Sequence, residues 1–242
     1  MEAIRATNLV KRYRGLTAVK GLNLEINQGE LFSLLGVNGA GKTTAIKMLT
    51  CLTKPTEGDA LVGGYSIVRD PEQVKRRIGV SPQETAVAPN LTVEENMALI
   101  CGIHGFSREK TKAKINELTG QFDLDSVLKR KAGKLSGGWQ RRVSIAMALI
   151  SEPEILFLDE PTLGLDVIAR HDLWDLIRNL KGKMTIILTT HYMEEAEALS
   201  DRIGILKNGA LLAVGTAEEL KHNAGANDFE TAFLTIVKEG RI

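Results

Sequence analysis

The feature that most constrains this chain is a glycine-rich segment between an apolar run and a helical stretch. It reads Gly36-Val37-Asn38-Gly39-Ala40-Gly41-Lys42-Thr43 and fits the pattern G-x-x-x-x-G-K-[ST]. The apolar run Leu31–Leu35 precedes it, and a helix is expected from about Lys42 to Leu52. Glycines let the backbone bend so that successive N–H groups face phosphate oxygens, and the helix start adds the positive end of its dipole. The segment predicts a phosphate-binding loop.

The side chains of this loop fit a nucleoside triphosphate. Lys42 can neutralise charge between the β- and γ-phosphates, and the Thr43 hydroxyl can ligate Mg²⁺. A glycine-rich turn that matches by chance is the alternative, and the position between strand and helix argues against it. The residues expected to hold the phosphates are Asn38, Gly39, Ala40, Gly41, Lys42, Thr43 and Thr44.

A second apolar strand, Ile155–Leu158, ends in the carboxylate pair Asp159 and Glu160. Burying carboxylates is costly unless a cation or proton neutralises them. Asp159 is therefore expected to meet Mg²⁺, directly or through water, and Glu160 to polarise the water that attacks the γ-phosphate. An acidic strand end in solvent is the alternative, which the phosphate loop disfavours. Because open α/β sheets bind ligands beyond the carboxyl ends of their strands, the two motifs together indicate hydrolysis of a nucleoside triphosphate.

Apolar runs of strand length recur before and after a helical middle part. Thr92–Glu95 fits a capping box, and Ser107 is placed to cap a second helix. Short apolar runs separated by helices predict a parallel sheet covered on both faces. The expected strands are Ile4–Val10, Leu22–Ile26, Leu31–Leu35, Ala60–Val62, Ile78–Val80, Ile155–Leu158 and Thr185–Leu188. We expect one domain over 1–242, with a core from 1–84 and 153–225, a helical subdomain at about 85–152 and a short C-terminal helix at about 226–240.

Composition and charge fit a soluble globular protein. Residues are 43% hydrophobic and 25% charged, and the formal net charge of +1 offers no strong basic field, so no nucleic-acid partner is expected. Cys51 and Cys101 match no metal or redox spacing and are expected to be buried thiols in a reducing cytosol. The start of the chain lacks an apolar signal core, and no apolar run approaches the roughly 18 residues of a membrane span, so any membrane role is expected to go through a partner.

A further set of motifs resembles the ATP-binding cassette (ABC) family. Leu135-Ser136-Gly137-Gly138-Trp139-Gln140 is similar to the family's signature sequence, although many members have glutamine where this chain has Trp139. The other marks follow in the family's order. They are Tyr13 for the adenine-stacking aromatic, Gln83 for the Q-loop, Leu165-Asp166 for the D-loop and His191 for the switch histidine, so the resemblance spans Ile4 to Lys221.

The resemblance implies an α/β fold: a P-loop NTPase (RecA-like) core with a mostly parallel sheet, an N-terminal antiparallel β subdomain and an inserted α-helical subdomain. It implies ATP and Mg²⁺ as cofactors, with Glu160, His191 and Gln83 in catalysis and Thr43, Gln83 and Asp159 near the metal. It also implies a head-to-tail homodimer, or a dimer with a paralogous ATPase subunit, that sandwiches two ATP. There the signature residues Ser136, Gly137, Gly138 and Gln140, with Asp166, serve the opposite subunit's site.

The stretch His191–Glu197, with the later Asp201-Arg202-Ile203, resembles the bacterial drug-resistance and natural-product exporter subfamily. The resemblance implies a separate integral-membrane permease of the type-2 exporter class, with the ATPase in the cytoplasm at the inner face of the cell membrane. A permease helix would dock near Gln83 and the loop Glu84–Pro89, where Ala86, Val87 and Ala88 are expected contacts. The alternatives are a soluble ABC ATPase, such as the iron–sulfur assembly type, an importer ATPase and a phosphotransferase outside the family.

Overall fold

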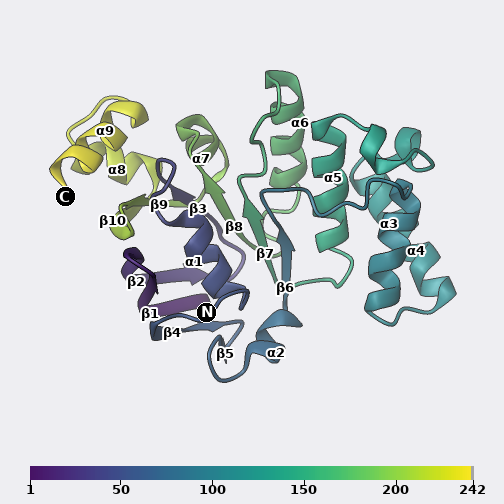
Figure 1. The fold of residues 1–242 in the computed structure, drawn as a ribbon. Coiled ribbons are helices and arrows are strands. Elements are labelled where there is room, and N and C mark those ends of the chain that lie inside the picture. The colour runs from purple at the N-terminus through teal and green to yellow at the C-terminus, as the bar shows by residue number, and fades with distance from the viewer. Residues whose placement is uncertain (241–242) are drawn as a thin grey trace.

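The computed structural model describes residues 1–240, which form two β-sheets with helices around them (Figure 1). A four-stranded antiparallel sheet has the order β2 (Leu16–Asn27), β1 (Glu2–Tyr13), β4 (Glu57–Val62), β5 (Tyr65–Ser66). A six-stranded sheet has the order β10 (Ala210–Gly215), β9 (Arg202–Lys207), β3 (Leu31–Leu35), β8 (Thr185–Thr190), β7 (Ile155–Asp159), β6 (Ile78–Ser81). In the larger sheet only the β9–β10 pair is antiparallel. The expected mostly parallel core and N-terminal antiparallel sheet are confirmed.

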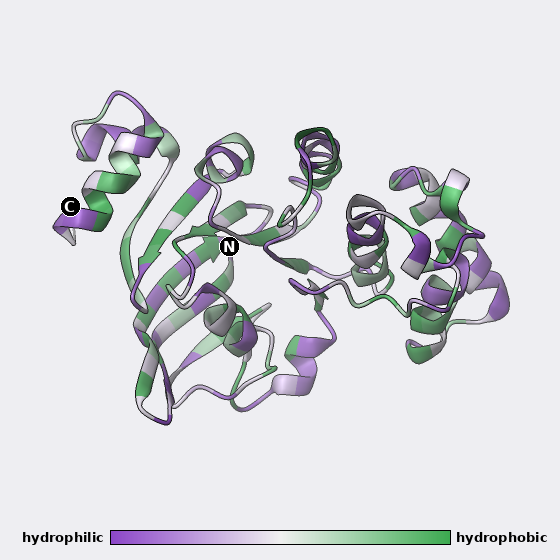
Figure 2. Cartoon of the chain, turned by 45° about the horizontal axis from the view of Figure 1, so that its top comes forward, coloured by the Kyte–Doolittle hydropathy of each residue, from purple (hydrophilic) through white to green (hydrophobic). Residues whose placement is uncertain are grey.

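Two apolar layers cover the larger sheet because successive residues of a strand face opposite sides. Phe157 and Ile187 pack on one side with the antiparallel sheet and with helix α1 (Lys42–Leu49). Leu156 and Leu158 pack on the other side with helices α5 (Gly137–Ala148) and α6 (Val167–Arg178). Figure 2 shows hydrophobic stretches along the strands, interrupted by hydrophilic residues. This arrangement explains why β3, β7 and β8 are buried along their whole length.

The helical middle part lies to one side of the sheet, beyond β6 (Figure 1). It holds α3 (Val93–Ile103), α4 (Arg108–Gln121), the 3₁₀ turns Asp125–Val127 and Ala132–Lys134, and α5. The predicted capping box is confirmed: the Glu95 N–H donates to the Thr92 hydroxyl, and the Thr92 N–H donates to the Glu95 carboxylate. Ser107 caps α4 by accepting from the Lys110 N–H. These helices share one apolar cluster with the sheet, and the proposed domain division stays a prediction.

The remaining helices are α2 (Pro71–Lys75), α7 (Met193–Leu199), α8 (Ala217–Asn223) and α9 (Phe229–Glu239). The C-terminal helix predicted at about 226–240 is α9, which buries Phe229, Phe233 and Ile236 beside Leu35 of β3. Within residues 1–240, no helix is long and apolar enough to cross a membrane.

Several sequence-based boundaries need correction. Strands β1 and β2 are longer than predicted, since their exposed residues break the apolar pattern although the backbone stays paired. The helix predicted to Leu52 ends at Leu49, because Cys51 adopts a left-handed backbone with φ of 59°. That turn leaves Cys51 half-buried rather than buried, whereas Cys101 is buried as predicted. Asp70 precedes α2 with Pro71 at the first position, but its side chain makes no capping hydrogen bond.

Candidate nucleotide site

A pocket of about 660 Å³ lies at the carboxyl ends of the parallel strands. Its walls come from the β1–β2 hairpin, the phosphate loop, the ends of β6, β7 and β8, and the β9–β10 turn. The lining residues are Tyr13, Leu16, Thr17, Ala18, Lys20, Asn38, Gly39, Ala40, Gly41, Lys42, Thr43, Thr44, Gln83, Glu160, Leu163, His191 and Asn208. The structure thus brings together the predicted adenine, phosphate, Q-loop and switch residues from six parts of the chain.

The phosphate loop has the backbone that its glycines predict. Gly39 and Gly41 have φ of 81° and 105°, in the left-handed region that favours glycine. Gly41 is the N-cap of α1, and a Cβ there would lie 2.5 Å from the Ala18 carbonyl oxygen. The Gly209 N–H in the β9–β10 turn also donates to the Ala40 carbonyl at 2.8 Å. The loop is therefore fixed by neighbouring backbone, with the N-terminus of α1 at the pocket.

Lys42, Glu160 and His191 form a chain of polar contacts at the pocket. The Lys42 Nζ lies 3.0 Å from Glu160 Oε1 and also donates to the Gly36 carbonyl at 2.7 Å. His191 Nδ1 lies 2.6 Å from Glu160 Oε2, and this nitrogen donates to the carboxylate when it carries the ring proton. Lys42 and Glu160 are each 5% exposed. An isolated charge this deep would be costly, and the ion pair offsets that cost.

The Glu160 side chain reaches the pocket because of a special backbone conformation. Glu160 has φ of 49°, which is uncommon for a residue with a Cβ. Its N–H donates to the carbonyl and the hydroxyl of Thr189, at 3.1 and 3.0 Å. The neighbouring strand β8 thus holds the turn in place. Sequence reasoning did not single out Thr189, although its place two positions before the predicted switch histidine was a usable signal.

Asp159 and Thr43 form the part of the site that fits Mg²⁺. The Thr43 hydroxyl donates to Asp159 Oδ1 at 3.3 Å, and the Thr189 hydroxyl donates to the same oxygen. Asp159 is 5% exposed, and Gln83 lines the pocket nearby. Carboxylate, hydroxyl and amide oxygens suit Mg²⁺, which usually takes few protein ligands and completes its shell with water and phosphate. No group of three or more His, Cys, Asp or Glu within residues 1–240 forms an all-protein metal cage.

The predicted signature residues lie outside this pocket. Ser136 and Gly137 are exposed at the start of α5, and a Cβ on Gly138 would touch Ala169 of α6. Asp166 caps α6 by accepting from the Ala169 N–H at 2.9 Å. Neither Gln140 nor these residues line the pocket of their own chain. This separation is what the resemblance implied for residues that serve a second subunit.

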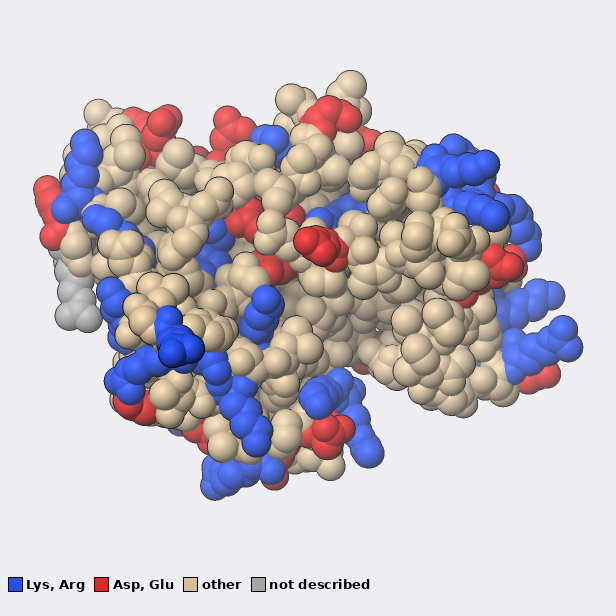
Figure 3. Space-filling view, viewed as in Figure 1, with Lys and Arg blue, Asp and Glu red and all other residues tan. Residues whose placement is uncertain are grey.

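Basic side chains gather over the antiparallel sheet (Figure 3). That sheet borders the pocket through Tyr13 and Lys20, and Lys11 Nζ lies 5.2 Å from the centre of the Tyr13 ring. Tyr13 is 46% exposed, so its ring is accessible to a flat ligand. A polyphosphate is attracted to a basic surround. The site therefore combines an aromatic platform, an anion-binding loop and a buried carboxylate.

Two buried ionisable residues beside the site were missed by sequence reasoning. Arg141 of α5 is 4% exposed, and Glu195 of α7 is fully buried. Each occupies a helix position that faces the interior, and an ionisable residue at such a position was the available signal. His104, His171 and His222, for which no role was predicted, are exposed.

Comparison with known proteins agrees with this geometry. The family described as ABC transporter matches residues 19–163. The doxorubicin resistance ATP-binding protein DrrA of Mycobacterium tuberculosis is 44% identical over 211 residues, which is 87% of this chain and 64% of the relative. The daunorubicin/doxorubicin resistance ATP-binding protein DrrA of Streptomyces peucetius is 41% identical over 226 residues, 93% of this chain and 68% of the relative. The chain thus spans about two thirds of the length of these relatives.

A solved structure gives the same result for the fold. A dimeric ATP-binding cassette in a post-hydrolysis state, bound to ADP and Pi, has a TM-score of 0.80 and 30% identity. The match covers 88% of this chain and 98% of that one. The sequence motifs, the pocket and these similarities agree, and the chain belongs to the ABC transporter family.

Proposed function

We propose that this chain binds and hydrolyses ATP to power a membrane transporter, and that the transporter is an exporter. The observation that carries the proposal is one pocket in which Lys42 and His191 each contact Glu160. The Thr43–Asp159 pair lies beside them. The names of the drug-resistance relatives support export.

The contacts suggest how the residues act on ATP. The Lys42 ammonium is paired with the Glu160 carboxylate at 3.0 Å. When phosphate oxygens bind this ammonium instead, the Glu160 carboxylate is released. Glu160 can then accept a proton from the attacking water, while His191 holds the second carboxylate oxygen in place. Thr43, Asp159 and Gln83 would hold Mg²⁺, which would supply positive charge to the phosphate oxygens. Phosphate binding is therefore the step that frees Glu160 to act as the general base.

The signature residues support a dimer. Exposed Ser136 and Gly137 at the N-terminus of α5 offer N–H groups and a helix dipole to an anion, yet they lie outside their own pocket. A second subunit related by a twofold axis can place them on this chain's γ-phosphate. The solved ATP-binding cassette with 30% identity is dimeric, which supports a dimer for this chain. Each site then lacks part of its transition-state stabilisation until the dimer closes.

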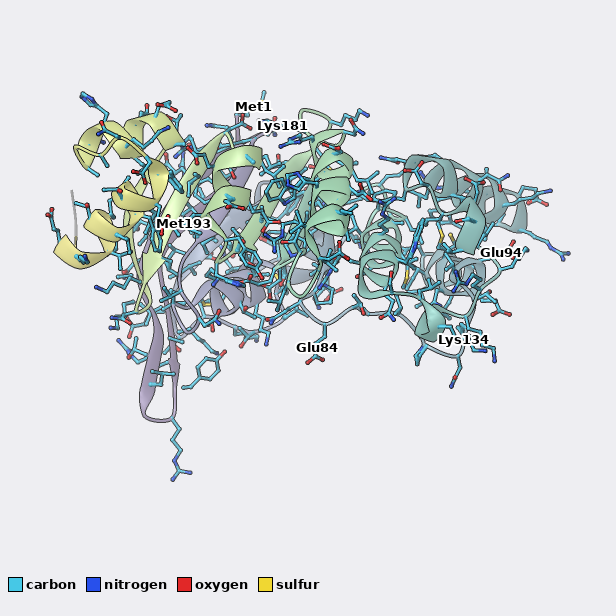
Figure 4. The ribbon with its side chains drawn as sticks, turned by 90° about the horizontal axis from the view of Figure 1, so that it is seen from above. Met1, Glu84, Glu94, Lys134, Lys181 and Met193 are labelled. Carbon is cyan, nitrogen blue, oxygen red and sulfur yellow. The ribbon has the colours of Figure 1, made fainter. Side chains whose placement is uncertain are left out.

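An apolar groove of about 360 Å³ supports a permease partner. It lies between the end of α1, strand β6 and helices α3 and α5, and its lining includes Leu52, Ile78, Ala86, Ile100 and Met147. Leu99 and Ile103, on the same helix as Ile100, are exposed. Figure 4 shows the Glu84 segment linking the sheet to the helical part that carries Glu94 and Lys134. Such a groove fits a short amphipathic helix, which would hold the protein at the inner membrane face.

Only one of the three predicted contact residues lines that groove. Ala86 does, whereas Val87 packs against the apolar cluster. Ala88 is held through its backbone, because the Asn96 amide accepts from its N–H at 2.7 Å and donates to its carbonyl at 3.1 Å.

The test is Glu160→Gln, with Glu194→Gln as the control at an exposed carboxylate. Glu160→Gln should bind ATP, lose turnover and show a dimer mass by light scattering with ATP. The control should behave as the wild type. Near-normal turnover would remove Glu160 from catalysis, and a monomer mass would contradict the sandwich. Affinity capture from detergent-solubilised membranes should recover a multi-span permease; recovery of soluble assembly proteins alone would overturn the transport role.

A further inference from the structure

Arg141 is a buried cation with an unusual set of partners. Its Nη1 and Nη2 donate to the backbone carbonyls of Pro82 and Gln83, each at 2.5 Å. Within residues 1–240, no carboxylate oxygen lies within 4.0 Å of its guanidinium nitrogens. Burial lowers the pKa of Arg141, and the more distant charges of Asp159 and Glu195 oppose that effect. Because a buried charge is rare unless it is satisfied, the two carbonyl contacts need a structural or functional reason.

The neighbours of Arg141 on α5 hold the same segment. The Ser144 and Ser81 hydroxyls lie 3.0 Å apart in the interior. The Thr85 hydroxyl donates to the Gln140 amide oxygen at 3.3 Å. Residues 140, 141 and 144 share one side of a helix, and they contact residues 81 to 85 in sequence. One face of α5 thus forms hydrogen bonds to the chain where it leaves β6.

The other end of this segment is attached to the helical part as well. Asn96 of α3 is 1% exposed and bonds both backbone groups of Ala88. The Gly133 N–H donates to the Pro89 carbonyl at 3.0 Å. By contrast, the pairing of β6 with β7 ends at Ser81 and Leu158. The segment from Pro82 to Pro89 is therefore fastened to the helices rather than to the sheet.

The hydrogen bonds between α5 and this segment connect two positions with proposed functions. Gln83 lines the nucleotide pocket, while Ser136 marks the exposed start of α5. Arg141 follows Ser136 by five positions, which is about 7.5 Å along a helix axis. A displacement of the Gln83 backbone by a bound γ-phosphate would pull directly on the helix that carries the signature residues.

We propose that Arg141 is a positioning residue: its guanidinium joins the Gln83 backbone to α5, so that Gln83 and the Ser136–Gly138 helix start move as one unit. This inference rests on the proposed ATPase function and adds the side chain that makes the connection. The planar fork of arginine offers two donors in fixed geometry to two successive carbonyls. Lysine offers one compact charge, and methionine fills the space without a donor.

The experiment compares Arg141→Met and Arg141→Lys with the wild type. Arg142→Gln is the matched control, because Arg142 is the next residue of α5 and pairs instead with Asp123 and Asp172 near the surface. Thermal unfolding establishes folding, fluorescent ADP and ATP analogues with Mg²⁺ report affinity, and steady-state assays report kcat and KM. Gln83→Ala is combined with Arg141→Met in a double-mutant cycle.

Arg141→Met should lower kcat at least tenfold while ADP affinity stays within about threefold. Arg141→Lys should recover part of the turnover, and Arg142→Gln should match the wild type. The Arg141→Met/Gln83→Ala double variant should be no slower than the slower single variant. Wild-type kcat in Arg141→Met, equal losses of kcat and ADP affinity, or independent effects that multiply in the double variant would each overturn the inference. A wild-type protein that binds no ATP would instead overturn the proposed function itself.

Discussion

Glu195 offers a quantitative test of how the interior around the site is organised. Its Oε1 accepts from the Thr162 hydroxyl at 2.8 Å and from the Trp174 Nε1–H at 3.0 Å. Thr162 follows β7, Trp174 lies in α6, and Glu195 lies in α7, shortly after His191. One carboxyl therefore joins three segments. Its Oε2 has no hydrogen-bond partner within residues 1–240.

The cost of removing this carboxyl follows from its two donors. Glu195→Ala leaves the Thr162 and Trp174 donors buried without an acceptor, at roughly 1–3 kcal/mol each. The total of about 2–6 kcal/mol corresponds to roughly 4–24 °C in Tm for a chain of this size, at about 2–4 °C per kcal/mol. Glu195→Gln keeps an acceptor oxygen at the same place. We therefore expect a large loss for the alanine variant and little loss for the glutamine variant.

The pH dependence has a defined sign. Burial raises the pKa of Glu195, the Thr190, Thr162 and Trp174 side chains oppose that effect, and the negative charge of Glu160 adds to it. A carboxyl whose folded-state pKa is raised contributes stability that is fully present below its unfolded pKa. That contribution is lost as pH rises through the folded pKa. Glutamine has no proton to lose, so Glu195→Gln should gain stability relative to the wild type as pH rises from 4 toward 8.

Urea unfolding curves at pH 5 and pH 8 for the three proteins would measure both effects. Glu194→Gln, at the exposed neighbouring position, is the control and should change neither curve. The reasoning fails if the alanine and glutamine variants lose equal stability, because the hydrogen bonds would then not be the cause. A glutamine variant that gains nothing at pH 8 would show that Glu195 carries no raised pKa.

Three further predictions concern the loop, the fold and the groove. Lys42→Ala should weaken ATP binding at least tenfold, measured by isothermal titration, since the ammonium is the buried cation at the phosphate loop; unchanged affinity would contradict its phosphate role. Gly58→Ala should lower the free energy of unfolding by more than about 2 kcal/mol, because its φ is 79° and a Cβ would lie 2.1 Å from the Asn8 carbonyl oxygen; wild-type stability in urea would contradict that geometry. Ile103→Asp, on the exposed side of α3 next to the groove, should reduce permease capture without changing basal turnover, and equal capture would remove this side of α3 from docking.

The central strands could be predicted from the sequence because they need no context. Leu31–Leu35 and Ile155–Asp159 are buried on both faces, so their continuous apolar runs stand out. The caps at Thr92 and Ser107 were also predictable, since each depends on residues three apart. The ends of β1 and β2 were not, because exposed polar residues there break the apolar pattern while the backbone pairing of β1 with β2, and of β1 with β4, continues.

For the site, the sequence by itself determined the groups that are proposed to carry the chemistry: the phosphate loop, the carboxylate pair and the order of the family motifs. Their chemistry requires fixed residue types at short spacing, which a single sequence displays. Only the tertiary structure decided that Lys42 pairs with Glu160, that Arg141 holds the Gln83 segment and that Glu195 joins three segments. The residues in these contacts lie 21 to 118 positions apart in the sequence. Local sequence patterns contain no information about neighbours at such separations.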